Sequence, residues 1–249
     1  MLAENAALPP DRCAIYAAGS LVRGWGNGKS DLDIYLITEV PWQGGVVSLD
    51  RIWAPPGVLP VQAFYWDGRR WDVEHWLDSQ VDEVLRFLSW ERFEAGEAKG
   101  ATLTDAEIAL IHRLGTCEVI EGSDWIKQRH QEFDRSAVKS VLAAQALYRL
   151  DLCTEDAIGM LEAGDAMSAV LAARQALGFA VDALMAVNGE FERSPKWRAK
   201  RMLTATPDGI SFEDYWSLET MNNYDPRNPD LWINDAMGFC QRIAEMIEL

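Results

Sequence analysis

The sequence predicts an α+β protein in which a strand-rich first part is followed by an all-α second part. Up to about residue 80, short apolar runs alternate with Gly, Pro, Asn and Asp, as in strands and turns. From about residue 78 the apolar residues recur at helical spacing, which continues beyond Gly122-Ser123 to the C-terminus. We therefore expect two domains, at residues 1–122 and 123–249, the second a helical bundle with short connections.

The strands are expected where apolar runs are bounded by turn residues. CAIYAA ends at Gly19-Ser20, LDIYLI is a second run, and VVSLDRIW is a third candidate. In VQAFYWDGRRWDVEHW, two further runs flank Asp67-Gly68, and Asp-Gly is the strongest two-residue signal for a β-hairpin. The Pro and Gly residues of EVPWQGG and APPGVLP are typical of loops.

The helices are expected where apolar stripes are bounded by caps. One stripe covers residues 81–88, and TLTDAEIALIHRLG begins with a Thr or Asp cap and ends at Gly115. In the second domain we expect a long helix over residues 126–150, a short one near 154–163 and another over 165–187. Further helices are expected from Ser194-Pro195 and over the last twenty residues.

Composition and charge restrict the class of function. The chain has 23 basic and 39 acidic residues and a net charge of −16, which repels nucleic acids and anionic lipids and favours cationic ligands. We find no stretch approaching the ~20 apolar residues of a membrane span and no secretory signal, which predicts a cytoplasmic protein. The four Cys and three His are scattered without a CxxC pair, so the sequence indicates neither a zinc site nor a disulfide framework.

The stretch GSLVRGWGNGKSDLD, residues 19–33, resembles two phosphate-binding loops but matches neither. A P-loop would need Gly at position 23, where this chain has Arg23. The dinucleotide pattern GxGxxG would need a third Gly at position 29, where it has Lys29.

Its two ends suggest different chemistry. Asp31 and Asp33 are one residue apart in a strand-like run, so their side chains point to the same face and can converge on a divalent ion. Oxygen-only ligation suits Mg²⁺ or Mn²⁺. At the other end, an apolar strand stops at Gly19-Ser20, where a small residue lets the backbone approach a phosphate and a helix N-terminus can offer amides. Together these ends predict a site for a triphosphate and a metal.

AIYAAGS, then ten residues, then DLDIYL resembles the Gly-Ser and Asp-x-Asp motif of the nucleotidyltransferase superfamily, which includes DNA polymerase beta and the aminoglycoside nucleotidyltransferases. The resemblance implies a mixed sheet in the first domain and two Mg²⁺ ions held by Asp31, Asp33 and a third carboxylate on a later strand. Asp72 fits this third position best, as metal ligand or base, and Glu74, two residues on and on the same face, is the alternative. The implied nucleotide contacts are Gly19 and Ser20 on the β and γ phosphates, with Arg23, Lys29 and Ser30 in the loop between.

The helical half resembles, more loosely, the C-terminal domain of small-molecule nucleotidyltransferases. Five basic residues and no acid lie between positions 193 and 201, a local reversal of charge that could collect a triphosphate. Lys196, beside the Pro that begins a helix, is the candidate for this contact. The alternative is an ordinary basic helix face paired with acidic neighbours.

These features favour an enzyme that transfers a nucleotidyl group, AMP from ATP first, to a hydroxyl of a small acceptor. A cationic acceptor such as an aminoglycoside would connect the protein with antibiotic resistance. A protein or tRNA acceptor, as in toxin–antitoxin systems, and an inactive nucleotide-binding module are the alternatives. The acceptor, the preferred base and the oligomeric state, a homodimer included, stay open.

Overall fold

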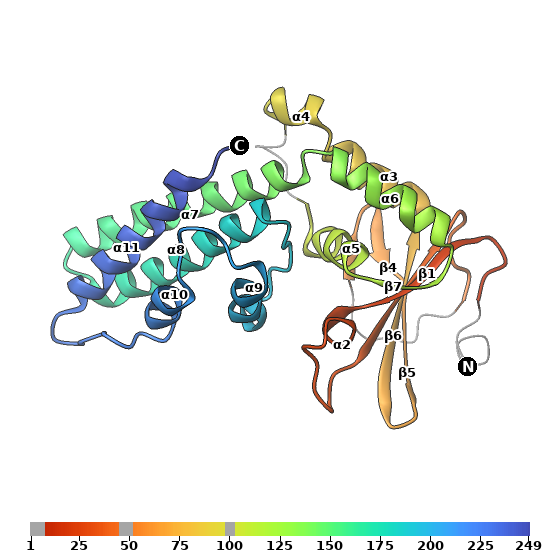
Figure 1. Ribbon diagram of the computed structural model, residues 1–249, viewed down its shortest axis with the longest axis horizontal. Helices are drawn as coiled ribbons and strands as arrows, with labels where there is room; N and C mark the ends of the chain where they lie inside the picture. Colours follow the sequence, from red (N-terminus) through yellow and green to blue (C-terminus); the bar gives the residue numbers. More distant parts are fainter. Residues whose placement is uncertain (1–7, 45–51, 98–102) are drawn as a thin grey trace. The chain divides into compact units, whose positions relative to one another are not determined.

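The computed structural model describes residues 8–44, 52–97 and 103–249. The chain divides into two compact units, Met1–Ala137 and Val138–Leu249. Unit 1 contains a mixed β-sheet with helices, and the elements of unit 2 are helical (Figure 1). This arrangement confirms the predicted α+β class with the sheet before the helices.

A five-stranded sheet forms the centre of unit 1, in the order β5-β6-β2-β1-β7. The strands β2 and β6 run parallel, and the other neighbours are antiparallel. A separate two-stranded sheet pairs β3 with β4. The bounds are β1 Arg12–Ala18, β2 Leu32–Thr38, β3 Ile52–Ala54, β4 Gly57–Leu59, β5 Val61–Trp66, β6 Arg69–Leu77 and β7 Glu118–Glu121.

The hairpin predicted at Asp67-Gly68 is confirmed, because β5 and β6 pair antiparallel on either side of it. Both turn residues have positive φ, 49° at Asp67 and 72° at Gly68. A two-residue turn of this kind matches the right-handed twist of the flanking strands, and Asp and Gly tolerate it. The third candidate strand, residues 46–53, lies mostly outside the described residues, and its last part enters β3.

Each face of the sheet has its own partners. One face carries an apolar cluster that includes Ile34, Leu36 and Val73. The other face carries the stacked rings of Tyr16 and Tyr35 and is approached by α5, whose Arg113 reaches Tyr35. In unit 1 the helices are α2 Gly19–Val22, α3 Asp78–Phe87, α4 Trp90–Glu94, α5 Asp105–Gly115 and α6 Ser123–Arg135 (Figure 1).

Helix α5 begins where the sequence predicts. The Thr104 hydroxyl accepts a hydrogen bond from the Glu107 backbone N–H, and the Glu107 carboxylate accepts one from the Thr104 N–H at 2.7 Å. This reciprocal capping satisfies two N–H groups that the first turn would otherwise leave without partners. The helix therefore has a fixed start, which sets the position of its last turn against the sheet.

The long helix predicted over residues 126–150 is wrong, because the structure has two helices there. Helix α6 ends at Arg135, Ser136 is extended, and α7 begins at Val138. The Ala137 N–H donates to the Leu88 carbonyl of unit 1 at 2.8 Å, which removes it from any helical bond. The apolar residues recur at helical spacing on both sides of the break, so this periodicity alone does not reveal it. The division of the chain consequently falls at 137/138 rather than at 122/123.

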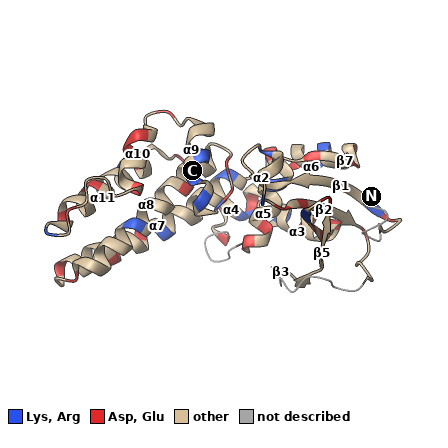
Figure 2. Ribbon diagram, turned by 90° about the horizontal axis from the view of Figure 1, so that it is seen from below, with Lys and Arg blue, Asp and Glu red and all other residues tan. Residues whose placement is uncertain are grey.

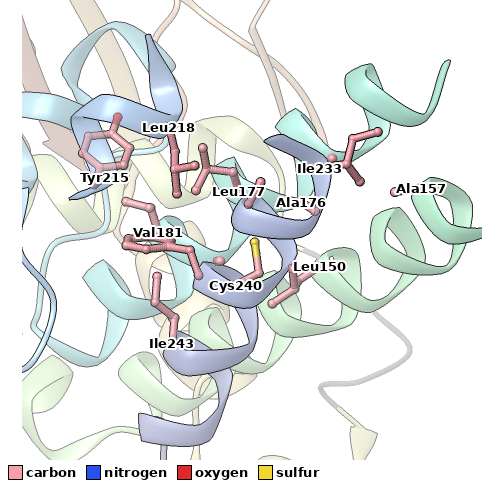
Figure 3. Packing of buried hydrophobic residues seen from close by; sticks show 14 of the residues in the cluster. Leu150, Ala157, Ala176, Leu177, Val181, Tyr215, Leu218, Ile233, Cys240 and Ile243 are labelled. Atoms are coloured by element: carbon pink, nitrogen blue, oxygen red, sulfur yellow. The ribbon is translucent and has the colours of Figure 1, made fainter. Parts of the chain in front are cut away.

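Unit 2 is built around α8, which contacts α7, α9 and α11. Its buried face is rich in alanine, and Ala173, Ala176 and Ala180 are fully buried. Small side chains let neighbouring helices approach closely, and larger residues such as Trp232, Tyr215 and Phe239 fill the remaining space. Figure 3 shows part of this core. The elements are α7 Val138–Glu162, α8 Ala166–Val187, a 3-10 turn Pro195–Trp197, α9 Arg198–Ala205, α10 Phe212–Glu219 and α11 Pro229–Met246.

Helix α8 corrects the expectation that no stretch is apolar enough to cross a membrane. By length and composition this 22-residue helix would be able to do so. However, 61% of its most apolar window is buried inside the structure, as in the core helix of a soluble protein. Figure 2 also shows acidic residues along the neighbouring α7, α10 and α11.

Candidate functional site

The structure brings Asp33 and Asp72 together near the place where the parallel strands β2 and β6 begin to pair. Asp33 is the second residue of β2, and its register partner on β6 is Asp72. Partners in a parallel pair lie about 4.8 Å apart and point to the same face. Asp31 directly precedes β2 and is close enough to Asp33 to raise its pKa. The three carboxylates predicted to hold the metals are therefore neighbours.

Gly19 packs directly against this site. It follows β1 with a φ of +83°, a conformation that favours glycine. A Cβ atom at this position would lie 2.0 Å from Asp33 Oδ2, which is far inside van der Waals contact. Both the backbone conformation and the space therefore call for glycine, and the Asp33 carboxylate rests on bare backbone.

Arg113, in the last turn of α5, is the site residue that sequence reasoning missed. Its Nη1 lies 3.0 Å from Glu74 Oε1 and 3.4 Å from Asp33 Oδ1, and it also donates to the Tyr35 hydroxyl. A basic residue near a helix C-terminus is common because it complements the helix dipole, so the sequence carried no signal of this role. The pKa of Arg113 is raised by Tyr35, Asp33 and Glu74, although burial opposes the rise.

The Glu74 carboxylate already accepts hydrogen bonds from neighbouring side chains on this face of the sheet. Besides Arg113, it accepts a hydrogen bond from the indole N–H of Trp76 at 3.0 Å, and it is 7% exposed. Asp72 is held differently, by Arg70 Nε of the same strand at 2.9 Å. The two candidates for the third carboxylate thus differ in surroundings, since Glu74 is buried among fixed donors and Asp72 is more exposed.

Asp33 lies in a strongly acidic environment. Burial raises the pKa of its carboxyl to about 6, Arg113 opposes this rise, and Asp31, Glu74 and Asp72 add to it. The carboxyl of Asp33 is therefore harder to ionise than that of an exposed aspartate.

The carboxylates are not already arranged around an ion. Within the described parts of the chain, no three His, Cys, Asp or Glu side chains form a ready metal-binding group. Asp33 and Asp72 each contact an arginine instead. The donor set nevertheless suits Mg²⁺ or Mn²⁺, because it consists of carboxylate oxygens and the four acids outnumber the two arginines.

The loop residues predicted to contact nucleotide have partners within the protein. The Arg23 guanidinium lies 3.6 Å from the centre of the Trp25 ring, and its Nη1 is 3.2 Å from His112 Nε2. The Ser30 hydroxyl accepts from the Asn27 N–H, which fixes a turn, and Lys29 is exposed. Helix α2, which begins at Gly19, has only four residues and so adds little dipole at this place.

In unit 2 the basic segment 193–201 divides into two groups. Arg198 and Arg201 are buried and share Asp182, at 3.2 and 2.8 Å, so they fasten α9 to α8 rather than project charge. Lys196 is exposed and lines a pocket of about 580 Å³ together with Arg174, Tyr215, Trp216 and Glu219. Only part of the segment is therefore available to attract an anion.

Comparisons with known proteins relate this mixed sheet and the helices after it to a solved structure. No family model matches the chain, and no curated protein matches it in sequence. Among solved structures, the crystal structure of a nucleotidyltransferase-like protein from Exiguobacterium sibiricum is similar, with a TM-score of 0.53. The match covers 98% of this chain and 72% of that chain. At 14% sequence identity, this likeness concerns the fold alone, so function has to be argued from the site.

Proposed function

We propose that the protein is a cytoplasmic, metal-dependent nucleotidyltransferase that moves a nucleoside monophosphate, AMP from ATP first, to a hydroxyl of a small acceptor. The observation that supports this most is the pairing of Asp33 with Asp72 beside Gly19. The position of Gly19 has no room for a side chain, because a Cβ atom there would collide with Asp33. Carboxylates on adjacent strands with a glycine against them suit a metal-bound triphosphate.

In this proposal Asp31, Asp33 and Asp72 hold two Mg²⁺ ions, or Mn²⁺, while Gly19 and Ser20 face the β and γ phosphates. When bound, the metals neutralise charge that develops at the α-phosphate. Asp72 accepts the proton of the acceptor hydroxyl, whose oxygen forms the new bond to the α-phosphorus. The bond to the bridging oxygen breaks, and pyrophosphate leaves with the electron pair.

Asp72 is the better base because it is less buried than Glu74 and accepts from Arg70, whereas Glu74 accepts hydrogen bonds from both Arg113 and Trp76. A proton acceptor must reach the acceptor hydroxyl, and a buried carboxylate with two donors on it is poorly placed for that. Glu74 is better suited to hold Arg113 in place. The net charge of −16 favours a cationic acceptor, such as an aminoglycoside, over tRNA.

The test is to incubate the protein with labelled nucleoside triphosphates, Mg²⁺ and pooled aminoglycosides, metabolites, proteins and tRNA, and to follow pyrophosphate and label. Asp33→Asn should abolish transfer, whereas Asp67→Asn in the exposed hairpin turn makes the same chemical change away from the site and should leave it intact. Labelled protein or tRNA would assign one of the other acceptors. Mg²⁺-dependent ATP binding without pyrophosphate release would indicate an inactive nucleotide-binding module.

A further inference from the structure

Arg113 has two kinds of contact in the site. Toward the interior it is fixed by Glu74 at 3.0 Å and by the Tyr35 hydroxyl. Toward the strand start it reaches Asp33 Oδ1 at 3.4 Å, a longer ion-pair contact. The first two contacts anchor the guanidinium, and the third is the one that can be exchanged most easily.

We infer that Arg113 is a resident counter-cation of Asp33 that competes with the divalent ion for this carboxylate, and that Glu74 is the positioning residue that holds it there. The inference rests on the proposed function, because it concerns the same metal site. Under this inference Arg113 balances the charge of Asp33. Glu74, one of the two candidates for the base, instead holds the Arg113 guanidinium in position.

The competition follows from the packing around Asp33. Gly19 lies against Oδ2, so that side of the carboxylate is closed by backbone, while Oδ1 faces Arg113. A divalent ion on Asp33 would therefore lie within a few ångströms of a guanidinium that remains charged. Even in a medium as polar as water, a single and a double positive charge at that distance repel enough to change affinity about tenfold.

The anchor explains how a cation can stay beside a metal site. Glu74 and Tyr35 lie opposite each other in the register of β6 and β2, two residues further along the strands than Asp72 and Asp33 and on the same face. Arg113 can thus give up Asp33 and keep its deeper contacts, so that the carboxylate becomes available without leaving the guanidinium buried and unpaired.

The inference is tested by measuring Mn²⁺ binding. The readout is the loss of the EPR signal of the free ion, at 0.15 M salt and without nucleotide or acceptor. Arg113→Gln should tighten Mn²⁺ binding about tenfold, whereas Arg113→Lys, which keeps the charge, should change it less than about threefold. Arg92→Gln, which removes an arginine from an exposed pair with Glu97, is the matched control and should leave binding unchanged. Thermal unfolding monitors folding. If the single variant is unstable, Glu74→Gln/Arg113→Gln replaces it, because this double variant removes the Glu74 charge together with that of its buried partner.

The results distinguish the inference from the proposed function. The inference is supported if folded Arg113→Gln or the double variant binds Mn²⁺ more tightly than wild type. This gain must be lost when Asp33→Asn is added. Unchanged or weaker binding in these variants, with wild-type Mn²⁺ binding that depends on Asp33, overturns the inference alone and leaves the metal site standing. No Asp33-dependent binding in any of these proteins overturns both.

Discussion

Asp33 and Asp72 are 39 residues apart in the chain and are register partners on the parallel strands β2 and β6. Their pairing places two carboxylates at one end of the sheet, where Gly19 adds a backbone surface without a side chain. Neither strand creates the site alone, because each contributes one side of it.

The first prediction distinguishes the two candidates for the third carboxylate. Asp72→Asn should lower kcat by about 100-fold or more, because it removes the proposed base and metal ligand. Glu74→Gln should lower kcat less than about tenfold, because Glu74 is proposed to act through Arg113. Steady-state kinetics of both purified variants measure this, and the reverse order of effects would make Glu74 the base.

The second prediction concerns Gly19. Gly19→Ala should destabilise the protein by about 1–2 kcal/mol, because alanine is strained at positive φ, and its Cβ would displace the Asp33 carboxylate. Nucleotidyl transfer should fall in the same variant. Urea denaturation measures the stability. Gly28→Ala is the control from the same loop, since a Cβ there meets open space, and equal stabilities of the two variants would count against this account.

The third prediction concerns acid stability. Burial lowers the pKa of His75 to about 4 from its ordinary value of 6.5, and its Nε2 lies 2.9 Å from Gln62 Oε1. Because the unfolded chain binds the proton more readily, His75 favours folding above about pH 6.5, and this contribution is lost as the pH falls toward 4. The loss amounts to up to about 3 kcal/mol. Relative to wild type, His75→Gln should therefore become less destabilised as the pH falls. A pH-independent difference in the free energy of unfolding would contradict this.

The fourth prediction concerns the buried ion pairs of unit 2. Asp182→Asn should lower the free energy of unfolding by about 3–5 kcal/mol, because it leaves Arg198 and Arg201 buried without their shared carboxylate. Asp225→Asn makes the same change in a pair whose arginine, Arg227, is 93% exposed, and should cost less than about 1 kcal/mol. Denaturant titration of the full-length variants, followed by far-UV circular dichroism, compares the two free energies of unfolding. Similar losses would show that burial does not decide the difference.

The fifth prediction tests whether the unit 2 pocket takes part in nucleotide binding. Lys196 and Lys200 lie at nearly equal distances, 5.2 and 5.1 Å, from the Trp197 ring, but of the two only Lys196 lines the pocket. Lys196→Ala should raise the KM for ATP about tenfold, as loss of one charged hydrogen bond would. Lys200→Ala should leave it unchanged. Equal effects would point to general charge rather than a specific contact.

The sequence predicted the elements whose signals are local. The hairpin at Asp67-Gly68, the capped start of α5 and the α+β order all depend on residues close together in the chain. It failed at Ser136, because the helical spacing of α6 and α7 continues through a break that a contact with Leu88 stabilises. It also left open whether residues 193–201 form a basic surface or pair with acidic neighbours, and the structure shows that two of the arginines, Arg198 and Arg201, pair with Asp182.

The sequence by itself determined the α+β class, with the sheet region before the helical region, and the spacing of Gly19, Asp31 and Asp33, because neighbours in the chain set turn, cap and strand geometry. The tertiary structure alone decided which later carboxylate stands beside Asp33 and which side chain faces it. Register between β2 and β6 selected Asp72, and the docking of α5 brought Arg113 to Glu74. Both relationships join residues that are 39 positions apart in the chain, and only the packing of the whole unit fixes them.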